Sequence, residues 1–280
     1  MKPHELYRLI GLPPEIAGKL DALAGEIDLA ALRPCLEQLQ DIRTAPEAYE
    51  HLQKHFETDE DNLRMLFCQL ECACRIYGRY QEMHIDDAIY RDTMKCFSRF
   101  LAECQRKNGR MFFDRGWWTY RQISMRLFRI GSLEYEFPPA GEGDYIAVHI
   151  PSDADLSKES VDASLAEAGT FFSTKYPDYE YDRYTCDSWL MSPVLRTLLP
   201  EDSNIVSFQR RFSITGACDE DSGCLEWLFC SPRATDFESL PEDTSLRKKA
   251  KALLLSGGHI GAANGTLGST VRRKDKRHIL

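Results

Sequence analysis

The 280-residue sequence has no apolar run of the roughly 18 residues that a membrane-spanning helix requires. Its first residues, MKPHELYRLIGLPPE, also lack the apolar stretch of a secretory signal peptide. We therefore expect a cytoplasmic protein without a membrane partner. In that compartment its ten cysteines are expected to stay reduced.

An excess of positive charge is missing as well. The chain has 35 Lys and Arg against 44 Asp and Glu, which gives a formal net charge of −9. Such a chain repels polyanions, so we expect no nucleic-acid partner. A local group of basic side chains could still hold a phosphate.

The sequence also offers no complete metal-ligand set, because there is no CxxC pair and no histidine pair that completes one. Cys68 and Cys72 share a face of a predicted helix, and Cys74 turns away from it. We interpret them as buried thiols, since Cys behaves as a small hydrophobe, and we predict no metal site. The acidic segment 219–223 lacks the spacing of a calcium loop and is interpreted as a solvated turn.

What is present is an ordinary globular composition, 43% hydrophobic, which allows one or two domains. Apolar residues recur every three or four positions in 62–80 and again after Asp86, which predicts helices that end at Asn108-Gly109. We therefore predict a helical N-terminal domain (1–110), a second domain (111–270) and a solvated basic tail (271–280).

The second domain is predicted to mix strands and helices. The expected strands are 119–137, 145–150, 183–191, 212–218 and 224–230, with the last two forming a hairpin and YIAVHI (145–150) forming a central strand covered on both faces. The expected helices start at Ser157, at Ser192-Pro193, at Asp202 or Ser203, and at Thr244. The glycine-rich segment 257–268 fits neither a Rossmann nor a P-loop pattern and is interpreted as a helix C-cap followed by a flexible strand or loop. The predicted fold class is α+β.

This order of elements resembles the GNAT acyltransferase fold. The segments LFRIGSLEYE (127–136), VHIPSDADLS (148–157), YTCDSWLMSPVLRTLLPEDSNIVSFQRRF (184–212) and GGHIGAANGTLG (257–268) also resemble a bacterial group that joins a helical N-terminal domain to a GNAT-like C-terminal domain. The resemblance implies CoA-dependent transfer of an acyl group to an amine. Acetyl-CoA or another acyl-CoA is the implied co-substrate, and a small-molecule or peptide amine is the implied acceptor.

The resemblance also implies where CoA binds. The pantetheine arm would follow the strand edge that contains Val148, Ile150 and Ser152, and the pyrophosphate would lie at the turn before a helix, near Lys158. The turn reads PSDADLSK (151–158) in place of the usual glycines, and its two Asp residues would repel phosphate unless they cap the helix. A GNAT-fold binding or regulatory protein that no longer uses CoA is therefore the alternative. Arg210 and Arg211 could hold a phosphate or a carboxylate, or could be solvated.

Four residues are predicted to be catalytic. Glu134 and Glu136 lie two apart in a strand and so share a face, where two close carboxylates make one a candidate general base; the alternative is a solvated face. His149 is a candidate base or a hydrogen-bonded core histidine. Tyr184 is a candidate acid for the leaving thiolate, on the resemblance, and Cys186 on the same strand face is a weaker candidate nucleophile.

Overall fold

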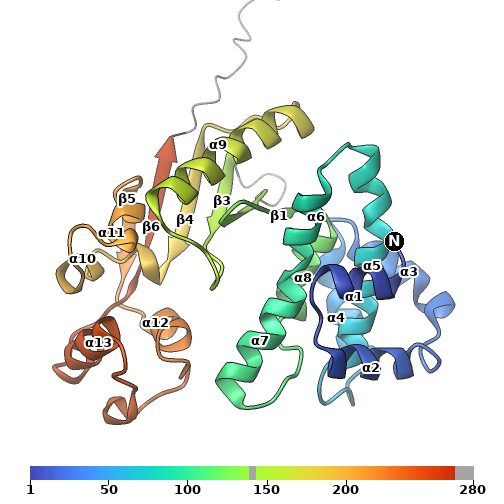
Figure 1. Ribbon diagram of the computed structural model, residues 1–280, viewed down its shortest axis with the longest axis horizontal. Helices are drawn as coiled ribbons and strands as arrows, with labels where there is room; N and C mark the ends of the chain where they lie inside the picture. Colours follow the sequence, from blue (N-terminus) through green and yellow to red (C-terminus); the bar gives the residue numbers. More distant parts are fainter. Residues whose placement is uncertain (139–142, 269–280) are drawn as a thin grey trace, which may run out of the picture. The chain divides into compact units, whose positions relative to one another are not determined.

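The computed structural model describes residues 1–138 and 143–268, and the chain divides into two compact units within the first strand, between Arg129 and Ile130. Most of the loop predicted at 138–143 and all of the basic tail predicted at 271–280 lie outside the described residues. The α+β fold class is confirmed, with a helical first unit and a mixed sheet with helices in the second (Figure 1).

The first unit is built from helices, as predicted. Its helices are α1 (Pro3–Leu9), α2 (Pro14–Leu23), α3 (Leu29–Leu39), α4 (Ala45–His55), α5 (Leu63–Glu82), α6 (Asp87–Met94), α7 (Cys96–Asn108) and α8 (Gly116–Ile123). The helix predicted over 62–80 is α5, and the helical segment predicted after Asp86 is divided into α6 and α7. The predicted stop at Asn108-Gly109 is confirmed, because Gly109 closes α7 with φ of 72°, a conformation that glycine adopts without a steric penalty.

The long helix α5 forms the centre of the helical unit. Leu66, Leu70 and Ile76 on this helix are buried, and so are the thiols of Cys68, Cys72 and Cys74. Burial raises the pKa of Cys68 to about 12, so the thiol stays protonated and packs as an apolar group. Among residues 1–138 and 143–268, no three His, Cys, Asp or Glu side chains are grouped for a metal ion.

The prediction of strands throughout 119–137 was wrong at its start. Residues 116–123 form α8, which packs against α4 and α5, and the strands begin only at Leu127. Thr119 donates its hydroxyl hydrogen to the Gln69 side chain on α5, and both residues are fully buried. The aromatic and β-branched residues here favour a strand locally, but this tertiary packing outweighs that preference.

The second unit contains a six-stranded sheet in the order β1-β2-β3-β4-β6-β5. The strands are β1 (Leu127–Ile130), β2 (Leu133–Glu136), β3 (Tyr145–His149), β4 (Arg183–Ser188), β5 (Ser213–Cys218) and β6 (Ala262–Gly268). The helices are α9 (Lys158–Lys175), α10 (Leu195–Leu198), α11 (Asn204–Gln209), α12 (Ser222–Trp227) and α13 (Ser245–Leu255), with 3-10 turns η1 (Trp189–Met191) and η2 (Phe237–Ser239). Ser157 caps α9, as predicted, and Ser203 caps α11, where Asp202 or Ser203 was expected; the helix expected from Thr244 is α13, with Thr244 as its cap.

The two parallel strands of the sheet separate at their carboxyl ends. β3 and β4 pair from Tyr145↔Arg183 to Ala147↔Thr185, yet β3 continues to His149 and β4 to Ser188. β3 is thus a central strand, but only Ile146 and Val148 are buried, while Tyr145, Ala147 and His149 are half-buried. The prediction that both faces are fully covered was therefore wrong, and one face has room for a functional site.

The hairpin predicted for 212–218 and 224–230 was also wrong. β5 pairs with β6 instead, and residues 222–227 form α12. Cys224, Leu225 and Phe229 pack into a small core with residues of α10 and α13. A short apolar run is ambiguous between strand and helix, and here its burial against other helices decides for the helix.

The glycine-rich segment supplies β6, an inner strand between β4 and β5, where we had predicted a loop or flexible strand. Gly265 is required by close packing, because a Cβ there would lie 2.6 Å from Met191 Cε and 2.9 Å from Phe212 Cβ. A glycine within a strand often marks such a close approach.

Asp221 joins the segment after β5 to the segment before β6. Its Oδ1 accepts hydrogen bonds from the backbone N–H groups of Ile260 (2.7 Å) and Gly261 (2.9 Å), and its Oδ2 lies 2.8 Å from His259 Nδ1. The hydrogen bond to Asp221 raises the pKa of His259 above its ordinary value. A raised pKa in the folded state stabilises the fold at pH values where the histidine is charged.

We expect the stabilising effect of His259 to depend on pH. It should be complete below the ordinary histidine pKa of about 6.5 and should decline as pH rises through the raised folded-state pKa, because the charge attraction to Asp221 then disappears. The measurement is the difference in Tm between the wild type and His259→Ala across this range. A difference that stays constant with pH would contradict the assignment.

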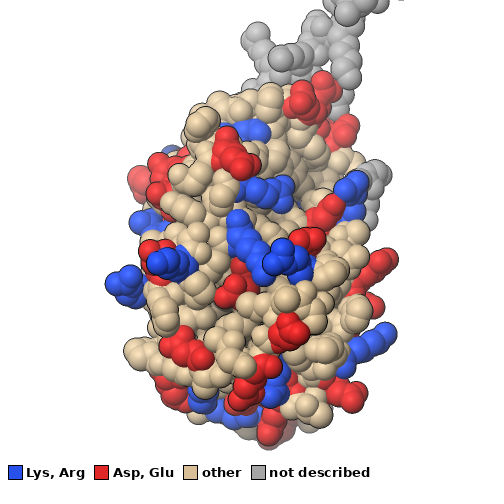
Figure 2. All heavy atoms as spheres, turned by 90° about the vertical axis from the view of Figure 1, so that its right-hand side faces the viewer, with Lys and Arg blue, Asp and Glu red and all other residues tan. Residues whose placement is uncertain are grey.

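No helix among the described residues has the length and apolar character to cross a membrane. On the face drawn in Figure 2, Lys and Arg side chains are interspersed with Asp and Glu side chains.

Candidate active site

The sheet of the second unit has two chemically different faces. One face carries Tyr135, Val148 and Tyr184 and packs against α9, where the Tyr135 hydroxyl lies 2.8 Å from Ser164 Oγ. Side chains alternate along a strand, and paired residues share a face. The opposite, polar face therefore carries Glu134, Glu136 and His149.

The predicted catalytic residues on the polar face come together as a pair. His149 Nε2 lies 2.7 Å from Glu136 Oε2, across the antiparallel β2–β3 pairing. The Glu136 side chain is only 7% exposed and the His149 side chain 26% exposed, so the carboxylate is enclosed and the imidazole is the more accessible of the two. A carboxylate that orients a histidine is the arrangement used by histidine bases.

Glu134 extends this group. Its Cα lies opposite that of His149 in the β2–β3 register, and its side chain is buried. The alternative of a solvated carboxylate face was therefore wrong for both Glu134 and Glu136. Carboxylates with this little exposure are costly to enclose without a compensating role.

A cavity at the carboxyl end of β4 was not anticipated from the sequence. It has a volume of about 410 Å³ and lies at the ends of β4, β5 and β6, with Asp187, Trp189 and Glu220 in its lining. Asp187 shares the face of Thr185, whose partner in β3 is Ala147. The period-two alternation of RYTCDS (183–188) already places Asp187 on the same face as Thr185. To recognise that this is also the face of Ala147, one needs the strand order, which pairs β4 with β3.

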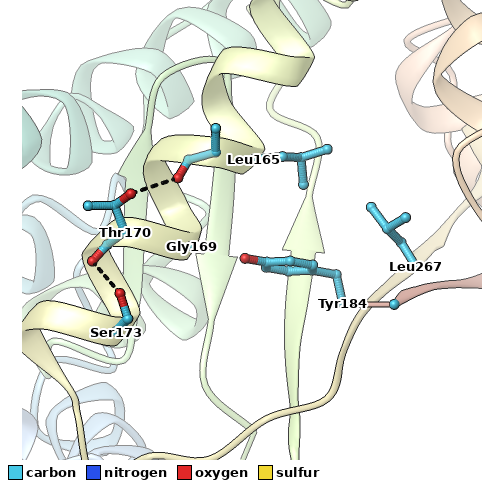
Figure 3. Close-up of a pocket in the computed structure, with 8 residues that line it drawn as sticks. Leu165, Gly169, Thr170, Ser173, Tyr184 and Leu267 are labelled. Atoms are coloured by element: carbon cyan, nitrogen blue, oxygen red, sulfur yellow. Dashed lines mark hydrogen bonds between the residues drawn. The ribbon is translucent and has the colours of Figure 1, made fainter. Parts of the chain in front are cut away.

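Tyr184 lies on the other face of the sheet. It lines an apolar cavity of about 540 Å³ between α9 and β6, with Leu165 and Leu267 (Figure 3). Its hydroxyl is 3.1 Å from that of Tyr181, and burial raises the pKa of Tyr184. The structure therefore does not bring Tyr184 together with the Glu136–His149 pair. Cys186 shares this buried face, where burial raises its pKa to about 12 and disfavours the nucleophilic thiolate.

The turn before α9 contains the predicted phosphate position. Asp155 accepts hydrogen bonds from the backbone N–H of Ser157 (2.9 Å) and from the hydroxyls of Ser157 and Ser160. The hydrogen bonds from Ser160 and Ser157 lower the pKa of Asp155. Asp155 thus hydrogen-bonds to Ser157, the cap residue of α9, and its negative charge stays at the predicted phosphate position.

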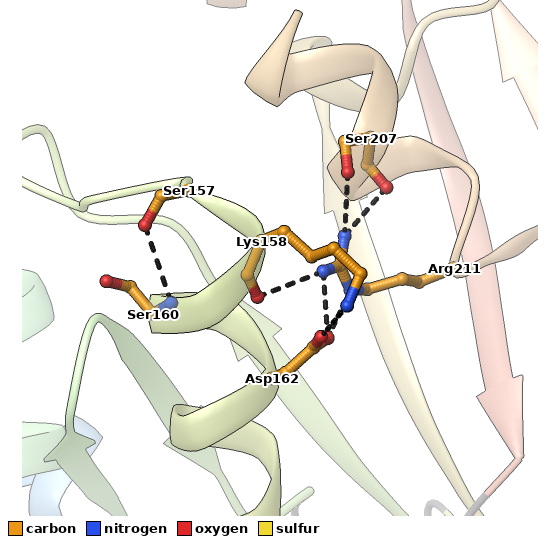
Figure 4. A network of polar contacts seen from close by, with 6 residues as sticks. All are labelled: Ser157, Lys158, Ser160, Asp162, Ser207 and Arg211. Atoms are coloured by element: carbon orange, nitrogen blue, oxygen red, sulfur yellow. Dashed lines mark hydrogen bonds and ion pairs between the residues drawn. The ribbon is translucent and has the colours of Figure 1, made fainter. Parts of the chain in front are cut away.

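Basic side chains near the start of α9 are engaged with Asp162 (Figure 4). Lys158 Nζ lies 2.8 Å from Asp162, and the Arg211 guanidinium donates to Asp162, to the Lys158 carbonyl and to the Ser207 carbonyl. Arg211 is therefore a bridge between α9 and α11. Arg210 is exposed and pairs with Glu201 at 3.8 Å.

The remaining residues predicted to bind the cofactor lie along one stretch of chain. Val148 is in β3 and buried, and Ile150 and Ser152 follow the strand toward α9. They thus lie in β3 and in the segment that connects it to α9.

Comparison with known proteins identifies the chain. Residues 127–267 match the model of the GNAT-like C-terminal domain, and residues 1–125 match that of the N-acyltransferase N-terminal domain. The chain belongs to the N-acyltransferases that combine these two domains. The predicted resemblance is confirmed, and no curated protein matches this acyltransferase.

Solved structures support the fold of this acyltransferase. An acyltransferase mutant in complex with octanoyl-CoA is 22% identical, with a TM-score of 0.79 over 95% of this chain and 87% of that one. An acyltransferase in complex with decanoyl-CoA and teicoplanin is also 22% identical, with a TM-score of 0.70 over 96% of this chain and 99% of that one.

Proposed function

We propose that this protein transfers an acyl group from an acyl-CoA thioester to an amine, with an amide and free CoA as products. The observation that carries the proposal is the Glu136–His149 pair beside the separation of β3 and β4. Membership of the N-acyltransferases supports the reaction class. The bound octanoyl-CoA and decanoyl-CoA in the related structures support the co-substrate.

The reaction requires a proton acceptor. The amine nitrogen attacks the thioester carbonyl carbon and must lose a proton, and the C–S bond then breaks as the thiolate leaves. We assign His149 to accept this proton, Glu136 to orient the imidazole, and Glu134 to add negative charge that stabilises its protonated form. Protonation of the thiolate by Tyr184 stays a prediction.

The described residues fit an acyl-CoA in two respects. The separated ends of β3 and β4 leave the strand edge of Val148, Ile150 and Ser152 as the proposed pantetheine contact. At the start of α9, Lys158 and Arg211 place two positive charges close to the helix N-terminus, where a pyrophosphate is favoured. Arg210 is the proposed outer cation.

For the acceptor, we propose an amine whose ammonium form is first attracted by Asp187 and Glu220 in the cavity at the carboxyl end of β4. Two structures of the same fold are complexes with teicoplanin or 10C-teicoplanin, which supports a second molecule bound together with the acyl-CoA or CoA.

A CoA titration tests the proposal. We expect acyl-CoA and CoA to raise the Tm. The free energy of stabilisation should follow mass action and reach about 2.7 kcal/mol when the ligand is at a hundredfold excess over its Kd. The alternative is a protein of the same fold that no longer uses CoA, and the Asp155 carboxylate at the phosphate position is the observation that favours it. The absence of any shift at millimolar CoA would select that alternative.

A further inference from the structure

The helical unit contains a cavity that the acyl-transfer proposal does not use. It has a volume of about 330 Å³ and lies where the end of α4, the start of α5 and the start of α8 meet. Its lining includes the aromatic residues Tyr49, Phe56, Phe113 and Trp117 and the carboxylates Glu57 and Asp114. No Lys, Arg or His is found among the described residues that line it. This volume suits a small ligand or the end group of a larger one.

The walls combine rings and negative charge. Phe113 is buried, and Tyr49 and Phe56 are half-buried. Trp117 is 43% exposed, although it is a large apolar side chain. An aromatic ring face attracts a cation through the quadrupole of its π system. The Arg115 guanidinium, which does not line the cavity, lies 5.7 Å from the Trp117 ring centre, within the range of a cation–π contact.

The carboxylates of the cavity are not equivalent. Asp59, which also lines it, accepts hydrogen bonds from the backbone N–H groups of Leu63, Arg64 and Met65 and so caps α5. Asp114 lies 3.9 Å from Arg115. Glu57 forms no ion pair recorded among residues 1–138 and 143–268, and it follows the carboxyl end of α4, where the helix dipole is negative. Glu57 is therefore the charge available to an incoming ligand.

We propose that this cavity binds the ammonium group of a cationic ligand, with the rings of Tyr49, Phe56 and Trp117 around the cation and Glu57 as its counter-charge. An anion would meet three carboxylates and is excluded on charge. A neutral apolar group would gain the ring contacts but would add no counter-charge for Glu57. The proposal is independent of acyl-CoA binding in the second unit.

The test compares choline with its neutral isostere, 3,3-dimethyl-1-butanol, by calorimetric titration of the full chain at constant ionic strength. We expect saturable choline binding and roughly tenfold weaker binding of the isostere, because it retains the shape and loses the cation–π attraction. Equal affinities, or no saturable binding of choline, would overturn the proposal.

Variants locate the site. Glu57→Gln and Trp117→Ala should each weaken choline binding several-fold, and both side chains are exposed, so the fold is retained. The matched control is Glu60→Gln, an exposed carboxylate that does not line the cavity and should leave binding unchanged. Choline binding that survives both cavity variants would place it elsewhere and refute the assignment.

Discussion

Replacement of His149 by alanine is expected to lower kcat for acyl transfer by roughly 10²–10⁴-fold, the usual contribution of a positioned proton acceptor. The imidazole is held 2.7 Å from Glu136 at the separation of the parallel strands and is the more accessible member of the pair. Release of the CoA thiol in steady-state assays measures this loss. The Kd for CoA should stay unchanged, because the proposed CoA contacts lie in other residues.

The matched control is His259→Ala. His259 also lies 2.8 Å from an aspartate, but it belongs to the connection between β5 and β6 and not to the polar face beside β3. Its removal should leave kcat unchanged at a temperature where the variant is folded. Equal losses of rate in the two variants, or full activity in His149→Ala, would reject His149 as the base.

Glu136→Gln separates orientation of His149 from a merely structural role. The amide keeps the shape of the carboxylate but cannot balance a charged imidazole, so kcat should fall while the Tm and the Kd for CoA stay at their wild-type values. A structural defect would lower the Tm together with the rate. Glu134→Gln should lower turnover with unchanged CoA binding, and an unchanged rate would remove Glu134 from the mechanism.

Phe172→Ala is expected to destabilise the second unit by about 3–5 kcal/mol, the range for truncating a buried phenylalanine. Phe172 on α9 is 1% exposed, and its ring centre lies 5.1 Å from that of Phe137 and 6.0 Å from that of Tyr181. Truncation leaves a cavity between α9 and the sheet, so the helix that begins beside the proposed phosphate position loses its anchor. Calorimetric unfolding measures the effect.

Glu167→Ala serves as the control for Phe172, because Glu167 is an exposed residue of the same helix and should change stability by less than about 0.5 kcal/mol. A loss for Phe172→Ala as small as that of the control would mean that α9 is not held by this aromatic cluster.

Local signals in the sequence were sufficient for much of the fold and part of the site. Ser157 was recognised as a helix cap, and Ser203 as one of two candidate caps, because a cap depends on a few neighbouring residues. The alternation in LEYE (133–136) placed Glu134 and Glu136 on one face. The prediction of a strand over 224–230 was wrong because the local pattern permits both strand and helix. Only packing against α10 and α13 selects the helix.

By itself, then, the sequence determined the helical first unit, the α+β second unit and the strand faces that carry Glu134, Glu136 and His149, since these follow from residue periodicity. The tertiary structure alone decided that β6 lies between β4 and β5, that β3 and β4 separate after Ala147 and Thr185, and that His149 meets Glu136. It also decided that Asp155 hydrogen-bonds to Ser157, the cap residue of α9, and that Arg211 bridges α9 to α11. These features join residues that are distant in the chain or depend on how side chains orient, and periodicity carries no information on either.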